Sequence, residues 1–301
     1  MPTFDLVAAQ ELPQSCIIYG PPFSGKTHMC AELANEGYTL HWFDLQQGRA
    51  TLRNAVQPEN YSKINYYYIP QSTKNNVAME VIGRLLEARG PIKFCEEHGK
   101  YMCQAVQCKD KLISVNPMEW TAKDVLVVDC MTELNDSTVL LATNDRQEAL
   151  YRQAFKLEFD DYGYQRLLLN KIMQNIQNRN FHRLFIAHDD IIEQNDGTKI
   201  IQPAIGTRNF SATIGGKFDH MIYCYMENKK QKAACGNGWS SKIMTGTRGS
   251  VRLEDGKHRL VDVLRCTKDT NSGAEAAKAE ANKSAAASLM AGGAKRLTLG
   301  K

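Results

Sequence analysis

The chain has 301 residues, 43% of them hydrophobic, and a formal net charge of +4. This fits one large domain, or one domain with a small appendage, and the mild charge neither demonstrates nor excludes nucleic-acid binding. The first residues lack a secretory signal, and no apolar run reaches about 18 residues, so we expect neither export nor a membrane-spanning helix. The nine cysteines then predict reduced thiols or metal ligands in a cytoplasmic protein rather than disulfides.

Residues 20–27 read GPPFSGKT and match the phosphate-binding P-loop pattern. An apolar run at 16–19 predicts a strand before the loop, and 27–36 predicts a helix after it, so a chance glycine turn is disfavoured. Backbone N–H groups of such a loop converge on a polyphosphate. Lys26 is expected to reach the β- and γ-phosphates, and Thr27 to hold Mg²⁺. The residues predicted to bind ATP are Gly20, Pro21, Pro22, Phe23, Ser24, Gly25, Lys26, Thr27 and His28.

Strands and helices alternate along the next part of the chain. Apolar runs predict strands at 38–43, 64–69, 124–129, 184–187 and 218–225. Helical periodicity predicts helices at 74–88 and 164–181. A hairpin is expected at 191–201, and the segments 242–247 and 258–264 suggest a β-rich C-terminal end. The predicted fold class is therefore α/β, with a mainly parallel sheet covered by helices and ligands at the carboxyl ends of its strands.

The composition divides the chain into a core at 1–272, which includes a small insert at 90–118, and a tail at 273–301. The tail is rich in alanine and lysine and has almost no large apolar side chains, so it is expected to stay mobile. Its basic end, Lys295-Arg296, is a candidate docking patch for a partner such as a single-strand-binding protein. A solubilising tail without a partner is the alternative.

The run VLVVD at 125–129 predicts a strand that ends in a carboxylate, the Walker B pattern. Asp129 is expected to hold the water shell of Mg²⁺. Glu133 could polarise a water molecule or could only be an N-terminal helix charge. His188 follows the strand at 184–187, so it is a candidate sensor of the γ-phosphate. Capping of that strand is the alternative role.

Four potential metal ligands lie within fourteen residues: Cys95, His98, Cys103 and Cys108. The gaps of two, four and four residues are those of a zinc knuckle, although the histidine comes third there and second here. Three thiolates and one imidazole suit tetrahedral Zn²⁺. Tyr101 could then stack on the bases of a single strand. Ordinary reduced cysteines are the alternative interpretation.

The motifs GPPFSGKT, HWFDL, VLVVDCMTEL, LFIAHDD and QPAIGTRNFSATIGGKFDHMIY together resemble the RecA-like core ATPases of bacteriophages, in particular the single-strand-annealing group related to Sak proteins. The resemblance covers residues 14–228. It implies a RecA-like P-loop fold, ATP hydrolysis, binding of single-stranded DNA, and assembly of a homo-oligomer as a ring or filament. A phage-encoded protein of this kind would act in the host cytoplasm.

The resemblance also implies roles for individual residues. His188 corresponds to the γ-phosphate sensor, and Lys217 is a candidate basic finger that reaches a neighbouring subunit's nucleotide, with Arg208 as second candidate. A DNA-binding loop follows the sensor strand in RecA-like folds, which implies DNA contacts for Lys199, Arg208 and Phe210.

One position departs from the family pattern. RecA-like proteins usually carry a catalytic glutamate just after the second strand, whereas this chain has Gln46 there, with Asp44 two residues earlier. Glutamine can orient a water molecule but is a poor base. Either Asp44 takes over or hydrolysis is slow.

Three functions compete at this point. The leading hypothesis is an ATP-dependent recombination protein that anneals or pairs single-stranded DNA. The second is a nucleotide-switched adaptor or loader with slow or no hydrolysis that acts through protein partners. A small-molecule kinase is disfavoured because the sequence shows no lid-like arginine cluster.

Overall fold

Six parallel strands form the centre of the structure. The computed structural model describes residues 13–69, 77–95, 97–108, 111–143, 157–177, 179–236, 240–248, 253 and 259–265. The parallel strands are β1 (Ser15–Tyr19), β2 (Thr39–Asp44), β3 (Ile64–Tyr68), β6 (Asp124–Asp129), β7 (His182–Ala187) and β10 (His220–Glu227). The sheet order is β11-β10-β1-β7-β6-β2-β3, with β11 (Lys230–Ala234) and β12 (Gly246–Thr247) both antiparallel to β10. The predicted, mainly parallel sheet is confirmed.

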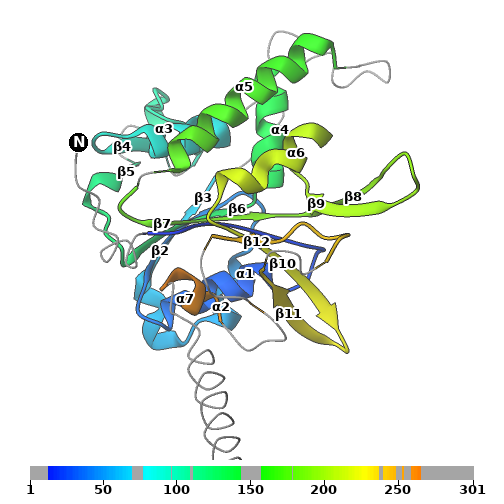
Figure 1. Ribbon diagram of the computed structural model, residues 1–301. Coiled ribbons are helices and arrows are strands. Elements are labelled where there is room, and N and C mark those ends of the chain that lie inside the picture. The colour runs from blue at the N-terminus through cyan, green and yellow to red at the C-terminus, as the bar shows by residue number, and fades with distance from the viewer. Residues whose placement is uncertain are drawn as a thin grey trace, which may run out of the picture. The chain divides into compact units, whose positions relative to one another are not determined.

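Helices cover both faces of this sheet (Figure 1). One face carries α3 (Val77–Glu87), α4 (Met131–Ala142), α5 (Phe159–Ile176) and α6 (Arg208–Thr213), and the other carries α1 (Lys26–Ala31), α2 (Arg49–Ala55) and α7 (Leu260–Leu264). The residues of β1 alternate between the two cores. Ile17 and Tyr19 belong to the first, and Cys16 and Ile18 to the second. Burial of both faces explains why the strands read as continuous apolar runs.

Two predicted helices have different bounds in the structure. The helix expected at 27–36 is α1, and a 3₁₀ turn, Glu32–Ala34, follows it. Helix α5 begins at Phe159, earlier than expected, because Glu158 and Asp161 form a capping box at its start. It ends at Ile176, so the chain reaches β7 through a short connection.

The segment at 258–264 was wrongly predicted as part of a β-rich end. Residues 260–264 form the short helix α7, and four of them, Leu260, Val261, Val263 and Leu264, are buried in the second core. Such a short apolar segment fits either a strand or a buried helix turn. The segment at 242–247 does contribute β-structure, through β12 and a bridge from Ile243 to Ile201.

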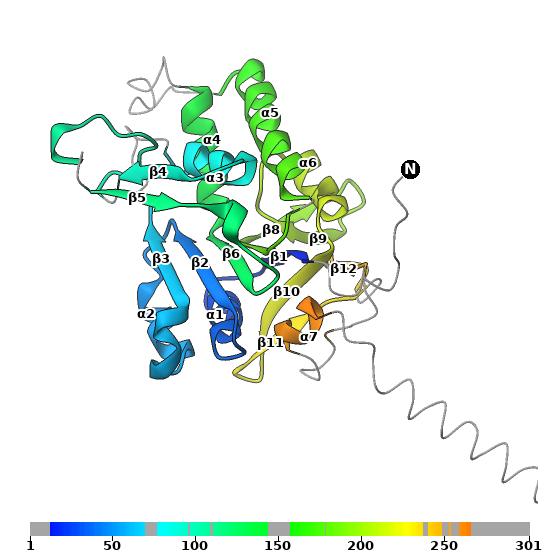
Figure 2. The ribbon, with the colours of Figure 1, turned by 90° about the vertical axis from the view of Figure 1, so that its left-hand side faces the viewer.

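Two hairpins project from the central sheet. β8 (Asp189–Glu193) and β9 (Lys199–Pro203) form the predicted hairpin at 191–201. β4 (Ile92–Cys95) and β5 (Leu112–Val115) form the second, inside the predicted insert. Figure 2 shows this second hairpin beside α3, on the opposite side of the sheet from α1 and α2. No helix among the described residues combines the length and the apolar character needed to cross a bilayer.

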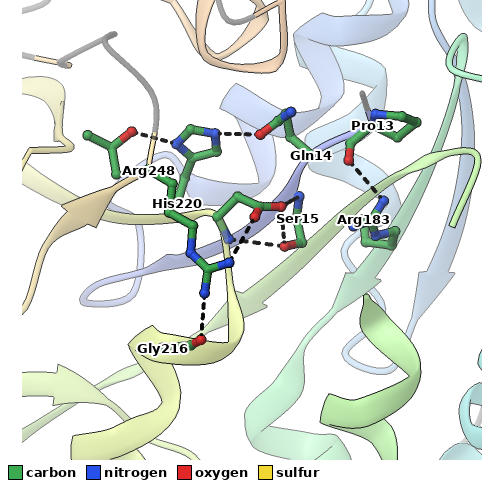
Figure 3. Close-up of polar contacts among 9 residues, drawn as sticks. Pro13, Gln14, Ser15, Arg183, Gly216, His220 and Arg248 are labelled. Carbon is green, nitrogen blue, oxygen red and sulfur yellow. Dashed lines mark hydrogen bonds and ion pairs between the residues drawn. The ribbon is translucent and has the colours of Figure 1, made fainter. Parts of the chain in front are cut away.

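A polar network joins the first residues of β1, β7 and β10 at the N-terminal edge of the sheet (Figure 3). The Ser15 N–H and hydroxyl both donate to Oδ2 of Asp219, at 2.8 and 2.7 Å. His220 makes one ring hydrogen bond to Thr247 and another to Gln14. The Ser15–Asp219 and His220–Gln14 contacts join residues that are 204 and 206 positions apart in the chain. They therefore fix where β1 lies relative to β10.

Candidate nucleotide site

The P-loop connects the end of β1 to the start of α1, at the C-terminal edge of the sheet. The Lys26 ammonium is buried and donates to the carbonyl oxygens of Gly20 and Pro21, at 2.8 and 2.7 Å. Burial lowers the pKa of Lys26 from its usual value. A buried cation whose hydrogen-bond acceptors, among the described residues, are neutral carbonyls of its own loop is well placed to bind an anion.

Two glycines are required by the backbone of this loop. Gly20 has φ +150, and a Cβ there would lie 2.1 Å from the carbonyl oxygen of Cys224. Gly25 has φ +91, and a Cβ there would lie 2.5 Å from Oε1 of Gln231. A larger residue is excluded at Gly20 by the close backbone carbonyl and is disfavoured at Gly25 by the left-handed backbone, since the Gln231 side chain could move aside. The loop therefore has the tight cradle that a polyphosphate needs, and Ser24 adds a buried hydroxyl that has no partner among the described residues.

Two carboxylates end neighbouring strands beside this loop. Asp44 and Asp129 pair in register at the ends of β2 and β6. The Thr27 hydroxyl donates to Oδ2 of Asp129 at 3.0 Å, as expected for two residues that share one magnesium ion. Burial, with a smaller contribution from the charge of Asp44, raises the pKa of Asp129 to about 7. The raised pKa means that ionising Asp129 costs free energy, and a divalent cation at this position would offset that cost. The donor set therefore fits Mg²⁺.

Asp44 has a positioning role in the structure. Its carboxylate is fully buried and accepts hydrogen bonds from the Tyr66 hydroxyl at 2.5 Å and from the Gln46 N–H at 2.8 Å. It therefore fixes the turn that carries Gln46. Tyr66 was not a predicted site residue, and its position in a run of three tyrosines gave no signal for it.

Gln46, Glu133 and His188 converge beside the acid pair. The Gln46 amide donates to Oε1 of Glu133 at 3.3 Å and lies 3.1 Å from Nε2 of His188. His188 therefore accepts at Nε2 and carries its proton at Nδ1, which is buried and has no partner among the described residues. Burial and the charge of Lys26 lower the pKa of His188, so the ring is neutral.

Most of these groups line a pocket of about 490 Å³, whereas Glu133 and Asp44 are not among its lining residues. Its lining includes Lys26, Thr27, Gln46, Asp129 and His188. Gln231 of β11 also lines it and was missed by sequence reasoning, because the basic run at 229–232 is typical of a solvated turn. A larger groove of about 1240 Å³ lies between the β8–β9 hairpin, α6 and residues 240–248. It contains neither the P-loop nor the acid pair, so we assign the nucleotide to the smaller pocket.

The other predicted contact residues lie outside this pocket. Lys199 and Arg208 are exposed, and Arg208 donates to the carbonyl oxygen of Glu193 at 3.1 Å. Phe210 is only 7% exposed and packs in the core, so stacking on a base would require α6 to move. Tyr101 is half-buried, with the Arg84 guanidinium 4.6 Å from its ring centre. Lys217 is exposed just before β10, at the opposite edge of the sheet from the P-loop.

The four predicted zinc ligands also come together. One ligand atom from each of Cys95, His98, Cys103 and Cys108 lies within 4.8 Å of the others. The three cysteines are buried and His98 is half-buried. All cysteines among the described residues are free thiols, so no disulfide competes for these sulfurs. The cluster is able to hold a metal ion.

The P-loop follows β1, and Asp129 ends β6, which is separated from β1 in the sheet by β7. This arrangement defines a RecA-like P-loop nucleotide-binding fold. The chain belongs to the AAA domain family, whose model matches residues 12–262. Among solved structures, the crystal structure of the RadB recombinase is similar, at 14% identity and a TM-score of 0.36 over 73% of this chain and 79% of that chain. Comparison with curated proteins found no match.

Proposed function

We propose that this protein is a Mg²⁺-dependent ATPase that binds single-stranded DNA and promotes its annealing or pairing. The observation that carries the proposal is the convergence of Lys26, Thr27 and Asp129 with a polar cluster around one pocket. Membership of the AAA domain family supports nucleotide binding. The phage-type sequence motifs motivate the DNA part of the proposal.

The residues of the pocket divide the work on ATP. Lys26 would turn from the loop carbonyls to the β- and γ-phosphates, and Thr27 and Asp129 would hold Mg²⁺. When bound, Mg²⁺ supplies charge neutralisation at the phosphates. Because Gln46 is a poor base, we assign the role of general base to Glu133, whose carboxylate accepts a hydrogen bond from the Gln46 amide. Gln46 would orient the attacking water, and neutral His188 would sense the γ-phosphate.

The position of the β8–β9 hairpin, directly after the proposed sensor His188, supports a DNA-binding role for it. The hairpin starts directly after His188, and the Ala204 N–H after β9 donates to the His188 carbonyl oxygen at 2.9 Å. The Thr132 hydroxyl accepts from the His188 N–H and donates to the Ala204 carbonyl oxygen. A change at the γ-phosphate would therefore reach the base of the hairpin. Its outer surface carries exposed Lys199 and Ile191.

Assembly into a ring or filament is part of the proposal. Lys217 lies at the edge of the sheet opposite its own P-loop, so it could act as a basic finger only on a neighbouring subunit's nucleotide. We also propose a core at 1–272, a tail at 273–301 that docks a single-strand-binding protein, and action in a host cytoplasm. The tail lies outside the described residues.

ATP turnover measured with and without single-stranded DNA tests this function. We expect stimulation by the DNA in the wild-type protein and loss of turnover in Lys26→Ala. Binding of single strands should weaken in Lys199→Glu and should decrease with rising salt, because the contacts are to phosphates. Absence of DNA binding at low salt, with and without ATP, would contradict the DNA role.

The second candidate, a nucleotide-switched adaptor, is favoured by one observation. The position that usually holds a catalytic glutamate holds Gln46, which donates to the neighbouring carboxylate instead of acting as a base. This function predicts ATP binding with negligible turnover and capture of a protein partner that depends on the tail. Turnover that responds to DNA would exclude it.

A further inference from the structure

We propose that the tip of the β4–β5 hairpin is a structural zinc site formed by Cys95, His98, Cys103 and Cys108. Tetrahedral zinc, with Zn–S near 2.3 Å and Zn–N near 2.0–2.1 Å, places its ligand atoms about 3.6–3.8 Å from one another. Nδ1 of His98 lies 3.2 Å from Sγ of Cys108 and 3.9 Å from Sγ of Cys103. The set is therefore close to the size of a zinc coordination sphere.

The backbone around the first ligand has the turn that such a site needs. The Gly99 N–H donates to the Cys95 carbonyl oxygen at 2.8 Å, and Gly99 has φ +61. The His98 N–H donates to Sγ of Cys95 at 3.3 Å. After the last ligand, the Lys111 N–H donates to the Cys108 carbonyl oxygen at 3.1 Å. These hydrogen bonds fix the backbone at two of the ligands, Cys95 and Cys108, and the last but one also orients the Cys95 sulfur.

Tyr101 anchors one side of the loop against the first core, but the metal-ligand cluster itself has few apolar neighbours. The hydrophobic cluster of the loop consists of the three cysteines, with Ala105 and Leu112 packed against them. So small a cluster contributes little stability by burial alone, whereas binding of zinc is itself folding free energy. Binding would release the thiol protons to solvent and leave a Zn(Cys)₃(His) centre with one negative charge. Exposed Lys93 and Lys100 on the same hairpin offset that charge.

The base of the hairpin is anchored separately. Phe94 is buried in the first core, where its ring contacts those of Phe43 and Tyr67. None of the described residues between 92 and 115 lines the nucleotide pocket. Removal of zinc is therefore expected to loosen the tip of the hairpin and to leave nucleotide binding intact, so this proposal and the proposed function can fail independently.

Elemental analysis of protein purified under reducing conditions from zinc-supplemented cells tests the site. We expect one zinc ion per chain, and at least a tenfold loss of zinc in His98→Ala and Cys108→Ser. Cys235→Ala, a buried cysteine outside the cluster, and Gln104→Ala, an exposed residue of the same loop, are the matched controls and should keep it.

Two measurements on the wild-type chain avoid any folding defect of the variants. Replacement of zinc by Co²⁺ should give the ligand-field and thiolate charge-transfer bands of a tetrahedral site. Removal of zinc by a chelator should speed tryptic cleavage after Lys100 and Lys111. Wild-type protein with no bound zinc and no tetrahedral Co²⁺ spectrum, bound iron in place of zinc, or full zinc content in Cys108→Ser would overturn the proposal.

Discussion

The two edges of the central sheet use their polar groups differently. At the N-terminal edge, Ser15, Asp219 and His220 are hydrogen-bonded to one another or to neighbouring side chains. The buried Arg183 guanidinium there donates to the carbonyl oxygens of Pro13, Arg179 and Phe181, and its Nε is the one atom of this edge that is buried without a partner among the described residues. At the C-terminal edge, Ser24 Oγ and His188 Nδ1 are buried without partners among the described residues, and Lys26 is a buried cation. Buried polar groups cost free energy unless they are paired. The comparison indicates that one edge stabilises the fold and the other is built to receive a ligand.

The largest expected effect comes from removing the charge at the C-terminal edge. Lys26→Ala should lower ATP turnover roughly 10³-fold, because it removes the main electrostatic contact to the phosphates. The free energy of unfolding should change by less than about 1 kcal/mol, because the hydrogen bonds of the buried ammonium within the described part of the chain are to neutral loop carbonyls. Turnover and chemical denaturation measured on the same preparation check this. A large loss of stability would contradict the conclusion that Lys26 serves ligand binding and not the stability of the fold.

The next effect concerns acid stability and the N-terminal edge. Burial lowers the pKa of both His182 and His220 to about 4. In the unfolded chain the two histidines take up a proton near pH 6.5, whereas in the folded chain they stay neutral down to about pH 4. The free energy of unfolding is thus not reduced by these histidines above about pH 6.5. It falls as the pH drops to about 4, by about 3 kcal/mol for each histidine.

Denaturation at a series of pH values between 4 and 7 measures this loss. His220→Gln keeps a hydrogen-bonding side chain but removes one titrating ring, so its stability should depend less steeply on pH than that of the wild-type protein. An unchanged pH dependence in this variant would contradict the role of His220.

The third prediction separates the roles of Gln46, which lines the pocket, and of Glu133, which is hydrogen-bonded to it. Glu133→Gln should lower turnover roughly 10²-fold with little change in ATP affinity, as expected on loss of a general base. Gln46→Glu places a carboxylate where the RecA-like sequence pattern has one, and it should retain turnover. Single-turnover kinetics and equilibrium binding distinguish chemistry from affinity. Full activity in Glu133→Gln would remove Glu133 from the mechanism.

The smallest effect is expected at the exposed side of the N-terminal network. Arg248 lies 3.6 Å from Asp219 and donates to the Gly216 carbonyl oxygen at 2.7 Å. An exposed ion pair contributes little, so Arg248→Ala should cost less than about 1 kcal/mol. Thermal unfolding checks this value. A much larger loss would show that the ion pair, and not the buried histidine, holds this edge together.

Local patterns explain what could be predicted from the sequence. The P-loop, the Walker B strand and the β8–β9 hairpin are each encoded in consecutive residues, and the four metal ligands lie in one short segment. Contacts that depend on strand order could not be predicted. Gln46 meets Glu133 and His188 across separations of 87 and 142 residues, only because β2, β6 and β7 are neighbours in the sheet.

The short C-terminal helix shows the other limit of sequence reasoning. Residues 260–264 are almost entirely apolar, and five residues are too few for a helical period to be distinguished from a buried strand. The second core decides their conformation, since α7 packs there with residues of α1 and α2. Packing against distant segments, which has no local signature, explains this error.

Calorimetric titration with ATP, with and without Mg²⁺, is the most direct test of the proposed site. The wild-type protein and Arg248→Ala should each bind one ATP per chain, more tightly with Mg²⁺, whereas Lys26→Ala should show no binding under the same conditions. Absence of ATP binding by the wild-type chain, or equal binding by all three proteins, would contradict the assignment of the C-terminal edge as a nucleotide site.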